Sequence, residues 1–149
     1  MKLKNLKKIA NQIRLNTVEI IHKTKTSHLG SSLSCVEILV SIYFSSFGLG
    51  KNINNKRNLK NTFILSKGHA APVFYSVLEN KNYISKKTFD SYSKPGSYLE
   101  EHPNIKINGV LVSSGSLGHG LSYAGGLALA DKINKKKYKH MVLMSDGEC

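Results

Sequence analysis

Four of the six histidines of this chain stand in short loops beside glycine or proline. A loop of this kind can fix the backbone of a histidine while its ring stays free. An imidazole with an ordinary pKa of about 6.5 can then exchange protons at neutral pH. A lone histidine of this kind is more often structural, so the interest lies in several of them meeting at one place. The four candidates, from SHLG, KGHA, EHPN and GHG, are His28, His69, His102 and His119, whereas we assign no function to His22 and His140.

A second candidate group combines the ending SDGEC with the glycine-rich segment SSGSLGHGLSYAGG at 113–126. Asp146 follows an apolar run, where a carboxylate can bind Mg²⁺, and Gly147 lets the backbone approach a phosphate. The glycines at 113–126 precede a helical pattern, so free N–H groups and the positive end of that helix could hold a diphosphate. The segment lacks the ending of a nucleotide P-loop and the spacing of a dinucleotide fingerprint. Close helix packing and an ordinary turn remain the structural alternatives.

The apolar pattern predicts an α/β fold that would position these groups. TFILS at 62–66 and YKHMVLM at 138–144 are typical of buried strands, and a third apolar run, VLV, precedes the glycine-rich segment. Helical spacing predicts a helix at 3–25 and a second helix from Ser34, with Ser34 and Glu37 as its capping box. Further helices are predicted from Pro72, after Ser85 and after the glycine-rich segment at 113–126. Open parallel sheets bind ligands at the carboxyl ends of their strands. We therefore expect several of the candidates to share one crevice.

Composition restricts the possible partners. The net charge of +13 invites a nucleic-acid interpretation, but nearly all the basic residues are lysines, and they are scattered among asparagines. We therefore expect no nucleic-acid partner. We also expect no membrane, because no apolar run approaches the roughly 18 residues of a span. The two cysteines, Cys35 and Cys149, suit reducing cytoplasm, and the histidine spacings typical of zinc sites are absent.

Five segments, taken in order, resemble the amino-terminal part of transketolase, and most closely the separate amino-terminal subunit found where that enzyme is split in two. They are SHLGSSLSCVEILVSIYF, FILSKGHAAPVFYSVLENKNYIS, EHP, SSGSLGHGLSYAGGLALA and VLMSDGEC. The resemblance implies one partial domain over 1–149 with the three-layer, parallel-sheet thiamine diphosphate-binding α/β fold. It also implies a thiamine diphosphate and Mg²⁺ enzyme that moves a two-carbon ketol unit between sugar phosphates. A carboxyl-terminal subunit or domain and an oligomer, homo- or hetero-, are implied as partners.

The same resemblance assigns roles to individual residues. His28 would polarise the donor sugar, His69 would lie beside the thiazolium and the diphosphate, and His102 would complete the proton-handling cluster. Asp146 would be the first Mg²⁺ ligand. The other positions that match the cofactor-binding residues are Gly115, Ser116, Leu117 and Gly147.

The chain also departs from the family pattern. Ser145 replaces the first glycine of Gly-Asp-Gly, which would be unfavourable if this position needed a positive φ or close contact with the diphosphate. The asparagine that completes the Mg²⁺ site and the glutamate that activates the aminopyrimidine are not in the sequence. We therefore expect a fold incomplete on its carboxyl-terminal side, and an isolated chain that is marginally stable and inactive.

Two alternatives to transketolase stay open at this point. The amino-terminal region of 1-deoxyxylulose-5-phosphate synthase shares the fold and the cofactor, although SKGHAAP and GSLGHG fit transketolase better. The chain could also be a non-catalytic remnant that serves as a binding module.

Overall fold

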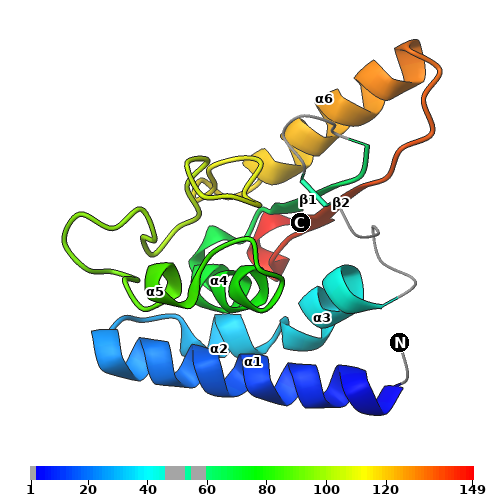
Figure 1. Ribbon diagram of the computed structural model, residues 1–149. Coiled ribbons are helices and arrows are strands. Elements are labelled where there is room, and N and C mark those ends of the chain that lie inside the picture. Colours follow the sequence, from blue (N-terminus) through cyan, green and yellow to red (C-terminus); the bar gives the residue numbers. More distant parts are fainter. Residues whose placement is uncertain (1–2, 46–52, 55–59) are drawn as a thin grey trace.

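The structure is a computed structural model that describes residues 3–45, 53–54 and 60–149 (Figure 1). The long helix α1 (Leu3–Thr24) forms one side of the molecule and buries its apolar stripe, which includes Ile13 and Ile20. Packed on it are α2 (Leu29–Leu33) and α3 (Val36–Phe44). The predicted first helix is therefore confirmed, and the helix predicted from Ser34 is confirmed as α3. The short helix α2 lies in a segment where the sequence predicted no helix.

The expected capping box at Ser34 is wrong. Ser34 has helical dihedrals (φ −63°, ψ −19°), and its hydroxyl donates back to the Ser31 carbonyl oxygen at 2.9 Å. A serine caps a helix from the extended region, which this backbone does not enter because α2 runs almost directly into α3. Glu37 instead forms an ion pair with Arg14 of α1.

Two parallel strands lie at the centre of the fold. β1 (Thr62–Leu65) pairs with β2 (His140–Leu143), with Thr62 opposite His140 and Leu65 opposite Leu143. The Ser66 N–H continues the ladder by donating to the Leu143 carbonyl at 2.9 Å. Both predicted strands are confirmed, and β1 is buried along its whole length while β2 is half-buried.

Helices cover both faces of this sheet. On one face, the Phe63 ring packs edge-on against Tyr43 of α3 and Phe74 of α4 (Ala71–Asn80). α4 has Pro72 in its first turn, as predicted, and is buried from Ala71 through Leu78 because it lies between α1 and the sheet. The other face carries α6 (His119–Ile133) (Figure 1). The predicted α/β layers around a parallel sheet are confirmed.

The segment between α4 and α6 is mostly irregular. α5 (Lys86–Phe89) is capped by Ser85, whose hydroxyl accepts from the Thr88 N–H at 3.1 Å, so the short helix predicted after Ser85 is confirmed. The VLV run at 110–112 does not pair in the sheet: the Val110 N–H closes a turn on the Ile107 carbonyl. None of the helices in the described ranges is both long and apolar enough to cross a membrane.

His140, to which we assigned no function, ties α6 to both strands. Its Nδ1 lies 2.8 Å from the Thr62 hydroxyl of β1, and its Nε2 lies 2.9 Å from a carboxylate oxygen of Asp131 in α6. The ring is almost fully buried. His140 is therefore a structural residue of the layer between the sheet and α6.

We expect His140→Ala to lower the free energy of unfolding by about 2 kcal/mol, because it leaves the buried Thr62 hydroxyl without its partner. Urea unfolding of the protein measures this loss. His22→Ala, on the exposed side of α1, is the matched control and should change the value by less than about 0.5 kcal/mol. Equal effects of the two substitutions would contradict this role of His140.

Candidate functional site

The fold brings His28 and His69 together from separate elements. His69 lies in the short 3-10 turn η1 (Gly68–Ala70), which follows the carboxyl end of β1. His28 precedes α2 and has left-handed backbone dihedrals (φ 70°, ψ 25°). The centroids of the two rings are 5.5 Å apart. Residues other than glycine rarely adopt this conformation, and it costs about 1 kcal/mol, so the surrounding fold must impose it.

His102 reaches the same region from the irregular segment. The buried Tyr75 of α4 holds its backbone, because the Tyr75 hydroxyl lies within hydrogen-bonding distance of the carbonyl oxygens of Glu100 (3.0 Å) and His102 (3.1 Å). The His102 ring lies against Gly115: a Cβ at that position would be 3.3 Å from His102 Cδ2. The predicted proximity of His102 to the glycine-rich segment is therefore present in the structure.

The charges around His69 favour its neutral form. Partial burial lowers its pKa, and the nearby Lys67, His28 and His102 lower it further, while Glu148 opposes them. The Lys67 ammonium is fixed at the α2–α3 junction, where it donates to the Ser31 carbonyl and the Ser34 hydroxyl, both at 3.3 Å. Burial and these cations therefore both favour the neutral imidazole, which is the form that can accept a proton.

The glycines of the 113–126 segment have different structural roles. Gly118 is the N-cap of α6 with a φ of +83°. A Cβ at residue 120 would lie 2.5 Å from both Cβ and Oγ of Ser66, so only glycine allows α6 to approach the end of β1. Gly125 and Gly126 face open space in the described part of the chain. Close packing therefore explains Gly120 but not the pair at 125–126.

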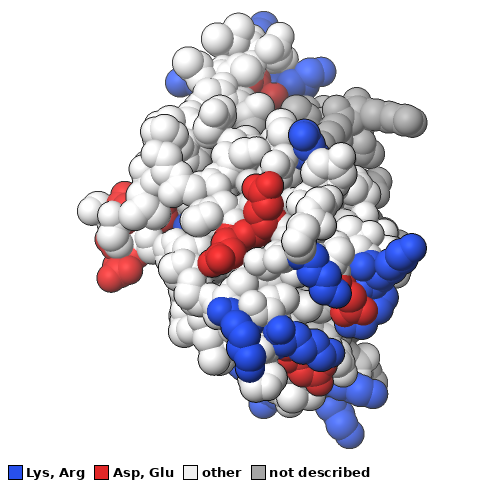
Figure 2. Space-filling view, turned by 90° about the vertical axis from the view of Figure 1, so that its left-hand side faces the viewer, with Lys and Arg blue, Asp and Glu red and all other residues white. Residues whose placement is uncertain are grey.

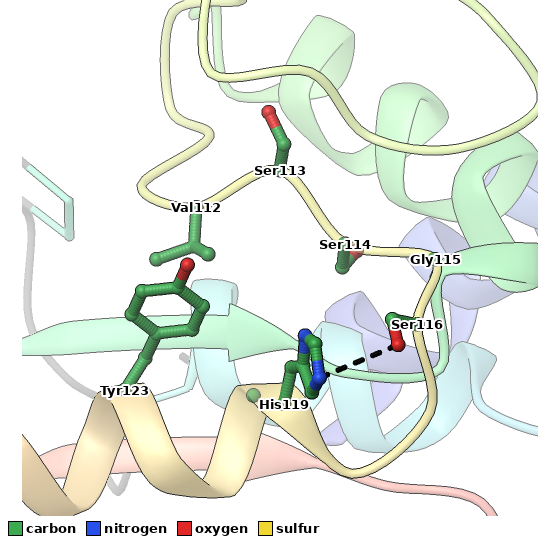
Figure 3. Close-up of a pocket in the computed structure, with 8 residues that line it drawn as sticks. Val112, Ser113, Ser114, Gly115, Ser116, His119 and Tyr123 are labelled. Carbon is green, nitrogen blue, oxygen red and sulfur yellow. Dashed lines mark hydrogen bonds between the residues drawn. The ribbon is translucent and has the colours of Figure 1, made fainter.

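A cavity of about 240 Å³ lies between the 112–116 segment and the start of α6 (Figure 3). The Ser116 hydroxyl and His119 Nε2 are 3.4 Å apart on one side of it. Val112 and Tyr123 point toward one another, whereas the Ser113 hydroxyl points away and accepts from the Ile105 N–H (Figure 3). The cavity is lined by hydroxyl groups and an imidazole, and it includes two predicted cofactor residues, Gly115 and Ser116.

Asp146 begins the turn η2 (Asp146–Glu148), three residues after the last residue of β2, and is exposed. Ser145 is extended (φ −89°, ψ 166°), so the strain that a positive φ would cause at this serine does not arise. A Cβ at Gly147 would meet no atom within 4 Å, which leaves room beside this backbone. Within the described ranges, no group of three or more histidine, cysteine or acidic side chains could hold a metal ion.

Glu148 is the site residue that the sequence interpretation missed. Its carboxylate accepts hydrogen bonds from Ser66, Gly118 and Ser145. Burial raises the pKa of this carboxyl group, but these hydrogen bonds outweigh burial and hold the pKa below its usual value. The spacing Ser145-x-x-Glu148 is itself a capping-box pattern and is the one signal in the sequence that could have identified the residue.

The sequence model described as "Transketolase, thiamine diphosphate binding domain" matches residues 5–145. The chain belongs to the transketolase family. It is 38% identical to an apulose-4-phosphate transketolase subunit of Phocaeicola vulgatus, over 99% of this chain and 52% of that protein. It is 32% identical to human transketolase, over 99% of this chain and 24% of that enzyme.

A solved structure shows the same fold. The transketolase of Leishmania mexicana superposes with a TM-score of 0.82 at 23% sequence identity, over 96% of this chain and 23% of that chain. The chain spans between about a quarter and a half of the length of these relatives. The resemblance inferred from the motifs is confirmed, and the thiamine diphosphate-binding fold is the one that this family shares.

Proposed function

We propose that the chain forms the amino-terminal, thiamine diphosphate-binding part of a transketolase-type enzyme. The proposed reaction transfers a two-carbon ketol unit from a ketose phosphate to an aldose phosphate. One observation carries the proposal: the rings of His28 and His69 lie side by side at the end of β1, with His102 against Gly115 beside them. Imidazoles that converge beside a glycine-rich turn suit chemistry in which several protons move.

The residues at the strand ends fit a diphosphate cofactor. Open space beside Gly147 leaves room for a phosphate. Ser114 carries a buried hydroxyl without a partner among the described residues, next to the predicted cofactor segment 115–117. His69, Gly115, Ser116, Leu117 and Gly147 would hold thiamine diphosphate, which supplies carbanion-stabilising chemistry when bound.

Mg²⁺ fits less completely, and we propose it for this site through Asp146 alone. Mg²⁺ requires near-octahedral oxygen ligation, and Asp146 supplies one carboxylate. The described ranges hold no group of three or more histidine, cysteine or acidic side chains that could complete this site, so water and the diphosphate would have to supply ligands as well. We therefore base no step of the reaction on the metal ion.

The histidines would divide the handling of substrate and protons. His28 is exposed, so its ring is accessible to a sugar, and we assign it to the donor hydroxyl and carbonyl groups. The neutral His69 would accept a proton at the reacting centre. His102, whose ring lies against Gly115, would hold or return a proton.

We further propose a carboxyl-terminal partner subunit or domain that completes the site. Two curated relatives are named as transketolase subunits, that of Phocaeicola vulgatus and a 6-deoxy-6-sulfo-D-fructose transketolase subunit of a Clostridium strain. The α6 helix exposes Leu121, Leu129 and Ile133 to solvent, which supports a covering partner.

We propose no nucleic-acid partner and a cytoplasmic location. On the face shown in Figure 2, basic and acidic side chains are intermixed, which does not favour nucleic-acid binding. The described cysteines are both free, as is usual in the reducing cytoplasm.

Calorimetry and a transfer assay test the proposal together. The complete protein that carries this chain, mixed with its carboxyl-terminal partner, is titrated with thiamine diphosphate in the presence of Mg²⁺ and then supplied with ketose and aldose phosphates. We expect saturable cofactor binding and ketol transfer with the mixture, and no transfer with the chain alone. A mixture that binds no cofactor, or a chain that is active alone, would contradict the proposal.

His28→Asn separates function from stability at the donor position. Asparagine tolerates left-handed dihedrals better than histidine does, so we expect the free energy of unfolding to stay equal or to rise by up to about 1 kcal/mol. We expect kcat/KM for the ketose donor to fall about 100-fold, because the imidazole is lost. Urea unfolding and initial rates at varied donor concentration measure both quantities. His22→Asn, on the exposed side of α1, is the control and should leave kcat/KM unchanged. An unchanged kcat/KM in His28→Asn would show that His28 does not act on the donor.

A further inference from the structure

The carboxylate of Glu148 joins three segments that are distant in sequence. Its Oε1 accepts from the Ser66 hydroxyl and from the Gly118 N–H, the latter at 2.9 Å. Its Oε2 accepts from the Ser145 N–H at 2.7 Å and lies 3.0 Å from the Ser145 hydroxyl. We call these four residues the Glu148 cluster.

A capping role accounts for only two of the four contacts that the Glu148 carboxylate makes in the Glu148 cluster. The bonds of Oε2 to Ser145 form the capping box of η2. The bonds of Oε1 lie outside that turn, at the end of β1 and at the start of α6. Ser66 extends the connection, because its Oγ accepts from the Gly120 N–H at 3.2 Å. A residue that only capped a three-residue turn would need neither of the bonds to Oε1.

Each joined segment lies within three positions of predicted cofactor residues. Ser66 lies three positions before His69, Gly118 directly follows 115–117, and Ser145 directly precedes Asp146 and Gly147. The carboxylate therefore lies where the three segments meet, and its four acceptor contacts limit how far they can separate. Charge-assisted hydrogen bonds of this kind are about twice as strong as neutral ones.

We propose that Glu148 is a positioning residue, whose carboxylate fixes the relative placement of the three segments that hold the cofactor. This inference rests on the proposed function. Glu148 does not act on the substrate: its oxygens are used by the protein's own donors. Its contribution is the preorganisation of groups that contact the cofactor.

The test compares substitutions in the complete protein with its partner subunit. Glu148→Gln keeps the size of the side chain but has only one acceptor oxygen, so it retains either the Oε1 or the Oε2 bonds. Glu148→Ala removes both sets. Glu19→Gln makes the same change of charge on the exposed side of α1 and is the matched control.

Two measurements apply to each variant. The first is the Kd for thiamine diphosphate with Mg²⁺, which we expect to rise about 10-fold in Glu148→Gln and about 100-fold in Glu148→Ala, as for other residues that orient ligands indirectly. The second is amide hydrogen exchange without cofactor in peptides spanning 114–120 and 144–149, which we expect to quicken about 10-fold in Glu148→Gln. Ser66→Ala combined with Glu148→Gln should weaken binding by less than the product of the two single effects.

The two measurements separate this inference from the proposed function. If the wild type binds the cofactor and Glu148→Gln binds it equally well, the positioning role is overturned, even if the melting temperature falls. If exchange in both peptides is unchanged, the Glu148 cluster does not hold the segments and the inference fails. If the wild type binds no cofactor, the proposed function fails and the cofactor role of Glu148 fails with it. The exchange data then decide only whether Glu148 fixes the segments.

Discussion

Replacing His69 with alanine is expected to lower ketol transfer by about 10³-fold in the complete enzyme, within the range that general acid–base catalysis supplies. The His69 ring lies beside His28 and is only partly buried, so its removal leaves no large cavity. The free energy of unfolding should therefore change by less than about 0.5 kcal/mol. Single-turnover rates and urea unfolding measure the two effects.

The pH dependence of the wild type gives an independent check on His69. Its lowered pKa means that the neutral, proton-accepting form predominates from below pH 6.5 upward. Activity that needs this form should rise as pH increases through a pKa below 6.5 and then level off. Lys67→Gln removes a cation that lowers this pKa, so the rise should move to higher pH. A His69→Ala enzyme that keeps the wild-type rate and pH profile would exclude His69 as the proton acceptor.

The sequence predicted the secondary structure well where the signal was local. Strand β1 is a run of apolar and β-branched residues, and α1 has a regular helical stripe, so both could be identified from spacing alone. The run at 110–112 has similar residues, but the Val110 N–H turns back to Ile107. Strand formation requires a paired neighbour, and a three-residue apolar run does not reveal whether one is available.

The site could be predicted only in part, for a physical reason. The carboxyl ends of parallel strands meet at one edge of a sheet, so proximity of the segments that carry His69 and Asp146 followed from the fold class. His102 follows no strand; the buried Tyr75 places it, across 27 residues of sequence. The contacts of Glu148 span 82 residues to Ser66 and 30 to Gly118, and no local pattern encodes such separations.

Gly120→Ala is expected to destabilise the protein strongly, because α6 approaches the end of β1 closely at this position. The added methyl group would lie 2.5 Å from Ser66 Cβ and 2.9 Å from its Cα, so the backbone itself must move. The shift would also lengthen the bond from the Gly120 N–H to the Ser66 hydroxyl. We expect a loss of about 2–3 kcal/mol in the free energy of unfolding, as for other overpacked sites.

Gly125→Ala, one and a half turns further along the same helix, is the matched control. The new methyl group meets no described atom within 4 Å, and alanine favours a helix over glycine by about 1 kcal/mol. The two substitutions are chemically identical, so opposite signs in urea unfolding would assign the difference to the contact between α6 and Ser66. Because that contact places Ser66 beside Glu148, Gly120→Ala should also weaken thiamine diphosphate binding, whereas Gly125→Ala should not. Destabilisation by both substitutions to the same degree would show that the contact between α6 and Ser66 does not explain the cost of alanine at position 120.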